Sequence, residues 1–137
     1  MDRGSTSQRP IRVAFVYERY RTWKALKALL STYPDIEVVA EVATSSNAVA
    51  VARHLHPDVI IMDAHEFFQN GTWAARHITK HWPEICVMVL TTSSEPELEM
   101  GIADTGICLI SGQSPEELVE RILESKFGNS ITRCPRE

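Results

Sequence analysis

Two carboxylates in this 137-residue sequence stand where buried strands would end. Asp63 follows the apolar run at residues 59–62, and Glu18 follows a β-rich run at residues 11–16. A strand that ends on a carboxylate places that group at the edge of a sheet, where ligand sites of α/β proteins are built. Both residues are therefore candidates for a chemical role. The alternative for Asp63 is a plain turn carboxylate.

Hydrophobic periodicity predicts five strands that alternate with five helices. The strands are expected at residues 11–16, 36–42, 58–62, 85–90 and 106–110. The helices are expected at residues 20–32, from the capping residues 44–47 to 55, and at 71–82, 96–104 and 115–124. Ser114 and Pro115 are typical of a helix start, so they support the last of these helices.

Strict alternation of apolar strands with helices is typical of a parallel sheet that is covered on both faces. We therefore expect a flavodoxin-like, doubly wound (βα)5 fold with a five-stranded sheet in the order 2-1-3-4-5. In that order the first and third strands are neighbours, so Glu18 and Asp63 would share one crevice at their carboxyl ends.

Composition excludes several classes of protein. The chain is 44% hydrophobic and 23% charged, has the length of one domain, and contains no apolar stretch near the roughly 20 residues of a membrane span. Its net charge is −4 and it has no Lys/Arg stripe, so we expect no nucleic-acid binding through this chain itself and no membrane role. The three cysteines do not indicate a disulfide framework.

The predicted domain occupies residues 11–126. Residues 1–10 have no apolar signal region and are expected to be a disordered leader, which favours the cytoplasm. Residues 127–137 are expected to be a C-terminal tail or linker.

From about residue 11 to residue 124 the chain resembles a response regulator receiver domain, most closely those of LuxR-type regulators. The matching segments are PDIEVVAEVATSSNAVAVARHLHPDVIIMD, the NG at residues 70 and 71, VMVLTT and SPEELVERI. The resemblance implies that a histidine kinase transfers a phosphoryl group to Asp63. It also implies that Mg2+ is held by Glu18, Asp63 and the backbone carbonyl of His65, and that Thr91 is the switch hydroxyl.

Three positions depart from the pattern of that family. Tyr17 stands in place of a second carboxylate, Ser111 in place of a lysine, and Cys108 in place of an aromatic switch residue. The missing charges predict a weakened Mg2+ site and weak or absent phosphorylation of Asp63. The chain is thus expected to be an atypical receiver in a two-component-like pathway. The alternative is a phosphorylation-competent receiver that controls an attached or lost DNA-binding output domain.

An enzyme or cofactor carrier on the same fold is the main rival, because fold does not determine function. A hydrolase with an aspartate nucleophile would need a second acid two residues after Asp63, where His65 stands. We therefore do not expect an enzyme. The resemblance implies a histidine kinase or another signalling protein as partner, and a homodimer through the fourth helix, fifth strand and fifth helix, where Glu120 and Arg121 would lie.

Two further motifs have a functional and a structural interpretation. His77 and His81 have the i, i+4 spacing of a metal-chelating pair, but without a third ligand a solvated helix face is the expected role. Phe67 and Phe68 are adjacent aromatics in the loop after Asp63. Either one of them is exposed beside the site, or both pack under the loop.

Overall fold

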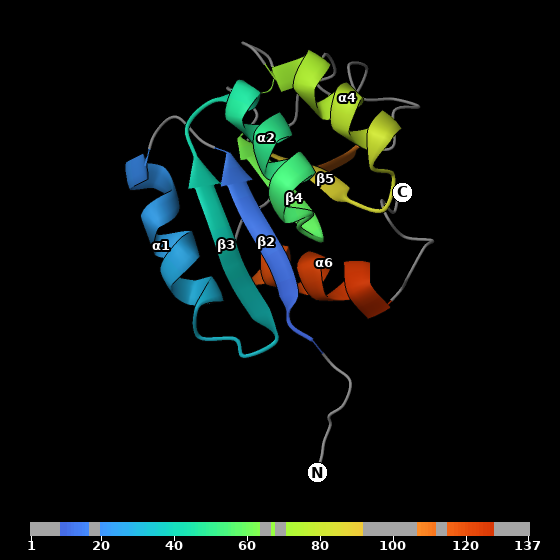
Figure 1. The fold of residues 1–137 in the computed structure, drawn as a ribbon. Coiled ribbons are helices and arrows are strands. Elements are labelled where there is room, and N and C mark those ends of the chain that lie inside the picture. The colour runs from blue at the N-terminus through green and yellow to red at the C-terminus, as the bar shows by residue number, and fades with distance from the viewer. Residues whose placement is uncertain are drawn as a thin grey trace.

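The computed structural model describes residues 9–16, 20–63, 67, 71–91, 107–111 and 115–127. Its centre is a five-stranded parallel sheet in the order β3-β2-β4-β5-β6 (Figure 1). The strands are β2 (Ile11–Val16), β3 (Ile36–Val42), β4 (Val59–Asp63), β5 (Cys86–Thr91) and β6 (Cys108–Ser111). The helices are α1 (Tyr20–Leu30), α2 (Ser45–Leu55), α4 (Thr72–His81) and α6 (Pro115–Phe127).

The first four strands along the chain lie in the order 2-1-3-4, which confirms that part of the predicted doubly wound topology. The fifth, β6, pairs in parallel with β5. The helix predicted at residues 96–104 lies outside the described residues. The complete set of five βα units therefore stays a prediction.

Two layers of helices cover the sheet, as the continuous apolar strands predicted (Figure 1). Leu30 of α1 and Ile122 of α6 pack with Phe15 and Ile61 on one face. Ala52 of α2 and Ile78 of α4 pack on the opposite face with the alternate strand residues, among them Met62. The four residues before Asp63 are fully buried in the central strand β4. Burial of such a side chain stabilises the fold by about 1.5–3 kcal/mol, so β4 is a rigid support for the carboxylate at its end.

The ends of α2 are capped at both termini. The Thr44 hydroxyl accepts a hydrogen bond from the Asn47 amide, as the predicted capping segment required. At the other end His56 adopts a left-handed conformation with φ 46°, and its amide donates to the Ala52 carbonyl. The Arg12 guanidinium of β2 donates to the Leu55 and His56 carbonyls at 2.6 and 3.1 Å. This side chain satisfies carbonyl groups that the helix leaves without partners, and it ties α2 to the sheet.

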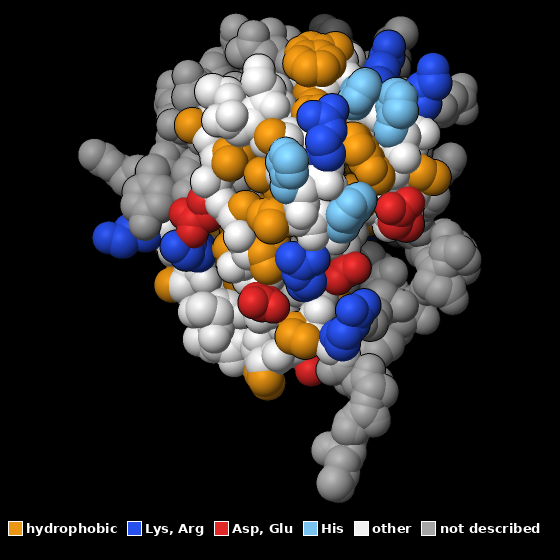
Figure 2. Space-filling model, in the orientation of Figure 1, with side chains coloured by type: hydrophobic (Ala, Val, Ile, Leu, Met, Phe, Trp, Pro, Cys, Tyr) orange, Lys and Arg blue, Asp and Glu red, His pale blue; other side chains and the backbone are white. Residues whose placement is uncertain are grey.

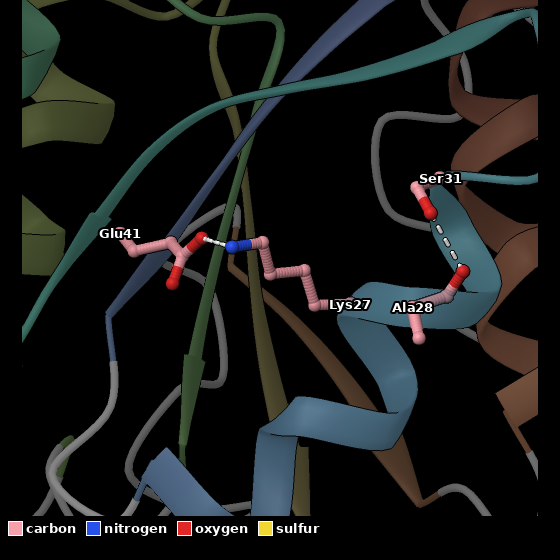
Figure 3. A network of polar contacts seen from close by, with 4 residues as sticks. All are labelled: Lys27, Ala28, Ser31 and Glu41. Atoms are coloured by element: carbon pink, nitrogen blue, oxygen red, sulfur yellow. Dashed lines mark hydrogen bonds and ion pairs between the residues drawn. The ribbon is translucent and has the colours of Figure 1, made fainter.

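The edge strand β3 is tied to helix α1 by charge. Lys27 forms an ion pair with Glu41, and directly after the last residue of α1 the Ser31 hydroxyl donates to the Ala28 carbonyl at 2.8 Å (Figure 3). Charged side chains on an edge strand discourage pairing with a strand of another chain. None of the helices that the structure describes is long and apolar enough to cross a membrane.

Candidate functional site at the carboxyl edge of the sheet

Asp63 is the last residue of the central strand β4. The side chains of residues 59–62 are fully buried, whereas Asp63 is half-buried. The strand therefore changes from core to solvent at this carboxylate. A side chain in this position is held by a rigid strand and can still be reached by a reactant, which an acceptor of a transferred group requires.

Strand register brings two further predicted residues to the same edge. Asp63 is in register with Leu90, so Thr91 lies one residue beyond it on the adjacent strand β5. Thr91 is in register with Ser111 of β6. Parallel strands are spaced about 4.8 Å apart, so the backbones of Asp63, Thr91 and Ser111 lie on three neighbouring strands within about 10 Å. The structure therefore groups the predicted acceptor, the switch-hydroxyl position and the position of the missing lysine.

The predicted switch position Cys108 lies at the start of β6, in register with Met88. It is three residues from the carboxyl edge, on the strand that ends at Ser111. The position therefore lies inside the sheet rather than at its edge. For Thr91, Cys108 and Ser111 the structure describes the backbone alone.

The remaining predicted site residues are Tyr17, Glu18 and His65, and all three lie outside the described residues. Strand β2 ends at Val16, which is in register with Met62. The chain segment with the predicted acid therefore begins next to the end of β4. Of the three proposed Mg2+ ligands only Asp63 is described, and within the described parts of the chain no group of three or more His, Cys, Asp or Glu residues could hold a metal ion.

The loop that follows Asp63 is anchored at its middle. Phe67 is fully buried in the core cluster beneath α2 and α4. The Thr72 hydroxyl at the start of α4 donates to the Phe67 carbonyl at 3.1 Å. Of the two interpretations of the aromatic pair, exposure is therefore excluded for Phe67, while Phe68 lies outside the described residues. Phe67 therefore fixes one point of the chain between Asp63 and α4.

Sequence reasoning missed the contribution of Thr72. A threonine at a helix start is typical of a capping residue, whose oxygen accepts a hydrogen bond from the helix backbone. The Thr72 hydroxyl donates to a carbonyl five residues earlier, in the loop that precedes the helix. No local pattern predicts such a contact, because it depends on the path of the loop.

Helices on both faces of a parallel sheet, with Asp63 at its carboxyl edge, define the described part of the chain as a doubly wound α/β domain. No protein-family model matches it. Over 123 residues it is 31% identical to the response regulator protein VraR of Staphylococcus aureus. The match covers 88% of this chain and 59% of that relative, so the chain spans little more than half the length of the relative.

Solved structures agree with this assignment. The response regulator domain of Thermotoga maritima CheB is 28% identical, with a TM-score of 0.72 over 85% of this chain and 96% of that one. A two-component response regulator of the LuxR family from Aurantimonas sp. shares the fold, with 23% identity and a TM-score of 0.77 over 88% and 87% of the two chains. The chain is a homologue of response regulators, and its fold is that of their receiver domains.

Proposed function

We propose that this chain is an atypical receiver domain in a two-component-like pathway, and that Asp63 is its candidate phosphoacceptor, which a histidine kinase phosphorylates weakly or not at all. The observation that carries the proposal is the position of Asp63. It is a half-buried carboxylate at the end of a fully buried central strand, on the edge that it shares with Thr91 and Ser111. The homology to response regulators supports the same assignment.

In this mechanism an Asp63 carboxylate oxygen attacks the phosphorus atom, an acyl phosphate forms, and the bond to the donor breaks. The rigid strand β4 positions the nucleophile, and the Thr91 hydroxyl is proposed to bind the transferred group. Mg2+, where Glu18, Asp63 and the His65 carbonyl hold it, would supply positive charge that offsets repulsion between carboxylate and phosphoryl group.

We further propose that this site is weakened. A phenol at Tyr17 is neutral at pH 7 and cannot replace the charge of a carboxylate. Ser111, in register with Thr91, provides no cation for the phosphoryl oxygens. Weak or absent phosphorylation of Asp63 would make this an atypical receiver, which signals through a partner protein, a ligand or a constitutive dimer.

The length of the relative favours a second candidate. The chain spans 59% of VraR, and a LuxR-family regulator shares its fold. In this alternative the domain is phosphorylation-competent and controls an attached or lost DNA-binding output domain. In both cases we propose a regulatory domain rather than an enzyme, working in the cytoplasm with a histidine kinase or another signalling protein. The proposed homodimer surface comprises the fourth predicted helix, β6 and α6.

Intact-mass spectrometry after incubation with acetyl phosphate and Mg2+ tests the proposal. An ordinary receiver domain, labelled under the same conditions, gives the reference fraction of phosphorylated chain. We expect a small fraction of the chain to gain one phosphoryl group, and Asp63→Asn to remove that adduct completely. Asp58→Asn is the matched control, because it changes the aspartate at the opposite end of β4, and it should leave the adduct in place.

An adduct that survives in Asp63→Asn would contradict the assignment of the acceptor. Labelling as complete as that of the ordinary receiver would contradict the weakened site and favour the phosphorylation-competent alternative. The absence of any adduct would leave the receiver fold without phosphotransfer to Asp63, and signalling through a ligand or partner would be the function to pursue.

A further inference from the structure

The outer face of α2 and α4 differs in charge from the rest of the chain. The sequence carries a net charge of −4, yet neither helix contains an aspartate or glutamate. Lys, Arg and His side chains gather instead on the side of the molecule where these helices lie (Figure 2). Arg53 of α2 and both Arg76 and Lys80 of α4 are exposed. We call this surface the α2–α4 face.

The α2–α4 face also carries exposed large apolar side chains. Trp73 in the first turn of α4 is 56% exposed, and Leu55 at the end of α2 is 37% exposed. No other large hydrophobic side chain among the described residues is exposed. A single exposed apolar residue is common on a soluble protein, but Trp and Arg together are typical of the residues that dominate binding at protein interfaces.

Helix stability alone does not explain this composition. Basic side chains in the last turn, such as Arg53 and Lys80, interact favourably with the helix dipole. The same dipole favours acidic side chains in the first turn, and neither α2 nor α4 has one there. Within the described residues neither Arg53 nor Lys80 forms an ion pair. The charges of these two side chains are therefore available to a partner.

The apolar and cationic groups are spread along the length of the face. Helices α2 and α4 pack over one face of the sheet, and both run from its carboxyl edge to its amino edge (Figure 1). Trp73 therefore lies toward the carboxyl edge, whereas Arg53 and Lys80 lie toward the amino edge. Since α4 has 10 residues, it is about 15 Å long. A group that covers Trp73 and also reaches the cations must be an elongated segment rather than a small ion.

We propose that the α2–α4 face binds an acidic segment of a partner protein. In this complex an apolar side chain of the segment covers Trp73, and carboxylates of the segment pair with Arg53 and Lys80. Complementary charge determines which partner binds and how fast, while the contact with Trp73 contributes much of the affinity. The face would serve the partner route of the proposed function, and only its role in signalling rests on that proposal.

A second copy of the chain fits the α2–α4 face less well. Glu116, Glu120 and Glu124 are exposed on one side of α6, and they would match the cations of the face. However, none of the described side chains of α6 is a large exposed hydrophobic one that could cover Trp73. A nucleic acid would be repelled by the net charge of −4. An acidic segment of a different protein is therefore the occupant that matches both features.

Fluorescence anisotropy of a labelled synthetic peptide, titrated with the full chain, tests the proposal. The peptide has about 14 residues, with Leu at i, i+3 and i+4 spacing and Glu at most other positions. We expect saturable binding that weakens as salt rises, because salt screens the charges. Tryptophan emission should shift to the blue when the peptide covers Trp73, and Trp73→Phe should remove this shift. A peptide with Gln in place of Glu should bind at least about tenfold more weakly.

Substitutions in the chain locate the binding surface. Trp73→Ala should weaken peptide binding at least about tenfold, because truncation of a dominant aromatic contact has an effect of this size. Lys80→Glu should weaken binding by a similar factor at low salt. Lys24→Glu is the matched control, because Lys24 is exposed on α1, in the opposite helix layer, and its substitution changes the net charge equally. It should change the affinity by less than about twofold.

Asp63→Asn should bind the peptide like the unaltered chain, so failure of phosphorylation and failure of this surface are distinguishable. Circular dichroism checks that each variant is folded. The proposal is overturned if the unaltered chain does not bind the acidic peptide, if the Gln peptide binds as tightly, or if Lys24→Glu weakens binding as much as Lys80→Glu. It is also overturned if sedimentation shows that the chain alone self-associates and that Lys80→Glu abolishes this, because the occupant would then be a second copy.

Discussion

Two aspartates border the same central strand, and they have different surroundings. Asp58 precedes β4 at the amino edge of the sheet, where its carboxylate accepts a hydrogen bond from the Arg12 amide at 2.8 Å. Its own amide donates to the Arg12 carbonyl, and its carbonyl accepts from the Cys86 amide. Asp63 ends β4 at the carboxyl edge, in register with Leu90.

The difference follows from the direction of the strands. At the amino edge Asp58 joins the start of β4 to β2 and β5, so its polar groups maintain the sheet. At the carboxyl edge the strands open into the loops that build ligand sites in this class of fold. One residue type at two ends of one strand therefore has a structural role at one end and a proposed chemical role at the other.

Removal of the Phe67 ring, which anchors the loop after Asp63 in the core, should have the largest effect on stability. Phe67 is fully buried, so Phe67→Ala removes a large side chain from the core and leaves a cavity. We expect the free energy of unfolding to fall by about 3–5 kcal/mol, measured by urea denaturation. Phe67→Leu keeps most of the buried apolar volume and should therefore cost less than Phe67→Ala. An unchanged free energy of unfolding in Phe67→Ala would show that packing of the ring does not hold the loop.

Restoring the missing charges should increase the reactivity of Asp63 at the carboxyl end of β4 and leave the structural role of Asp58 at the other end unchanged. Tyr17→Asp together with Ser111→Lys supplies the second carboxylate and the cation of the family pattern. We expect acetyl phosphate labelling of Asp63 to become faster by at least about tenfold, which corresponds to about 1.4 kcal/mol of transition-state stabilisation. The measurement is the rate of adduct formation by mass spectrometry.

Asp63→Asn in the restored background is the control, and it should abolish the labelling. A folded double variant that is labelled no faster than the original chain would show that the missing charges do not limit the reaction. The path of the loop, anchored by Phe67, would then be the feature to change next.

At the amino edge, Asp58→Ala should lower stability and spare phosphorylation. It removes one side-chain hydrogen bond and keeps both backbone bonds of residue 58. Because this bond is exposed, we expect a loss of about 1 kcal/mol in the free energy of unfolding, with the labelling of Asp63 unchanged. Loss of the phosphoryl adduct in a folded Asp58→Ala chain would contradict the proposal that Asp58 has a structural role only and that Asp63 alone has the chemical role.

The parts of the molecule that the sequence predicts are those set by local pattern. The run at residues 59–62 is apolar at every position, which is typical of a central strand, and Asp63 at its end indicates the edge. The resemblance to receiver domains added Thr91 and Ser111, and the register places both at that edge. The roles of these residues stay predictions.

Contacts that depend on the path of the chain could not be predicted from local pattern. Adjacent Phe67 and Phe68 give no sign of which ring enters the core. The spacing of His77 and His81 indicates one helix face, but not that a hydrogen bond to a backbone carbonyl orients one ring against the other. Such details depend on side-chain rotamers and on neighbouring elements rather than on periodicity.

The smallest expected effect concerns the ion pair between Lys27 of α1 and Glu41 of β3. The two side chains are 41% and 24% exposed, so water and salt screen their attraction. We expect Glu41→Gln to lower the free energy of unfolding by no more than about 1 kcal/mol at low salt, and by less at high salt. Urea denaturation at two salt concentrations measures this, with Glu37→Gln on the same edge strand as the control. A larger loss that salt does not reduce would mean that Glu41 acts through packing or hydrogen bonding, and that the edge strand β3 depends on this side chain as the amino edge depends on Asp58.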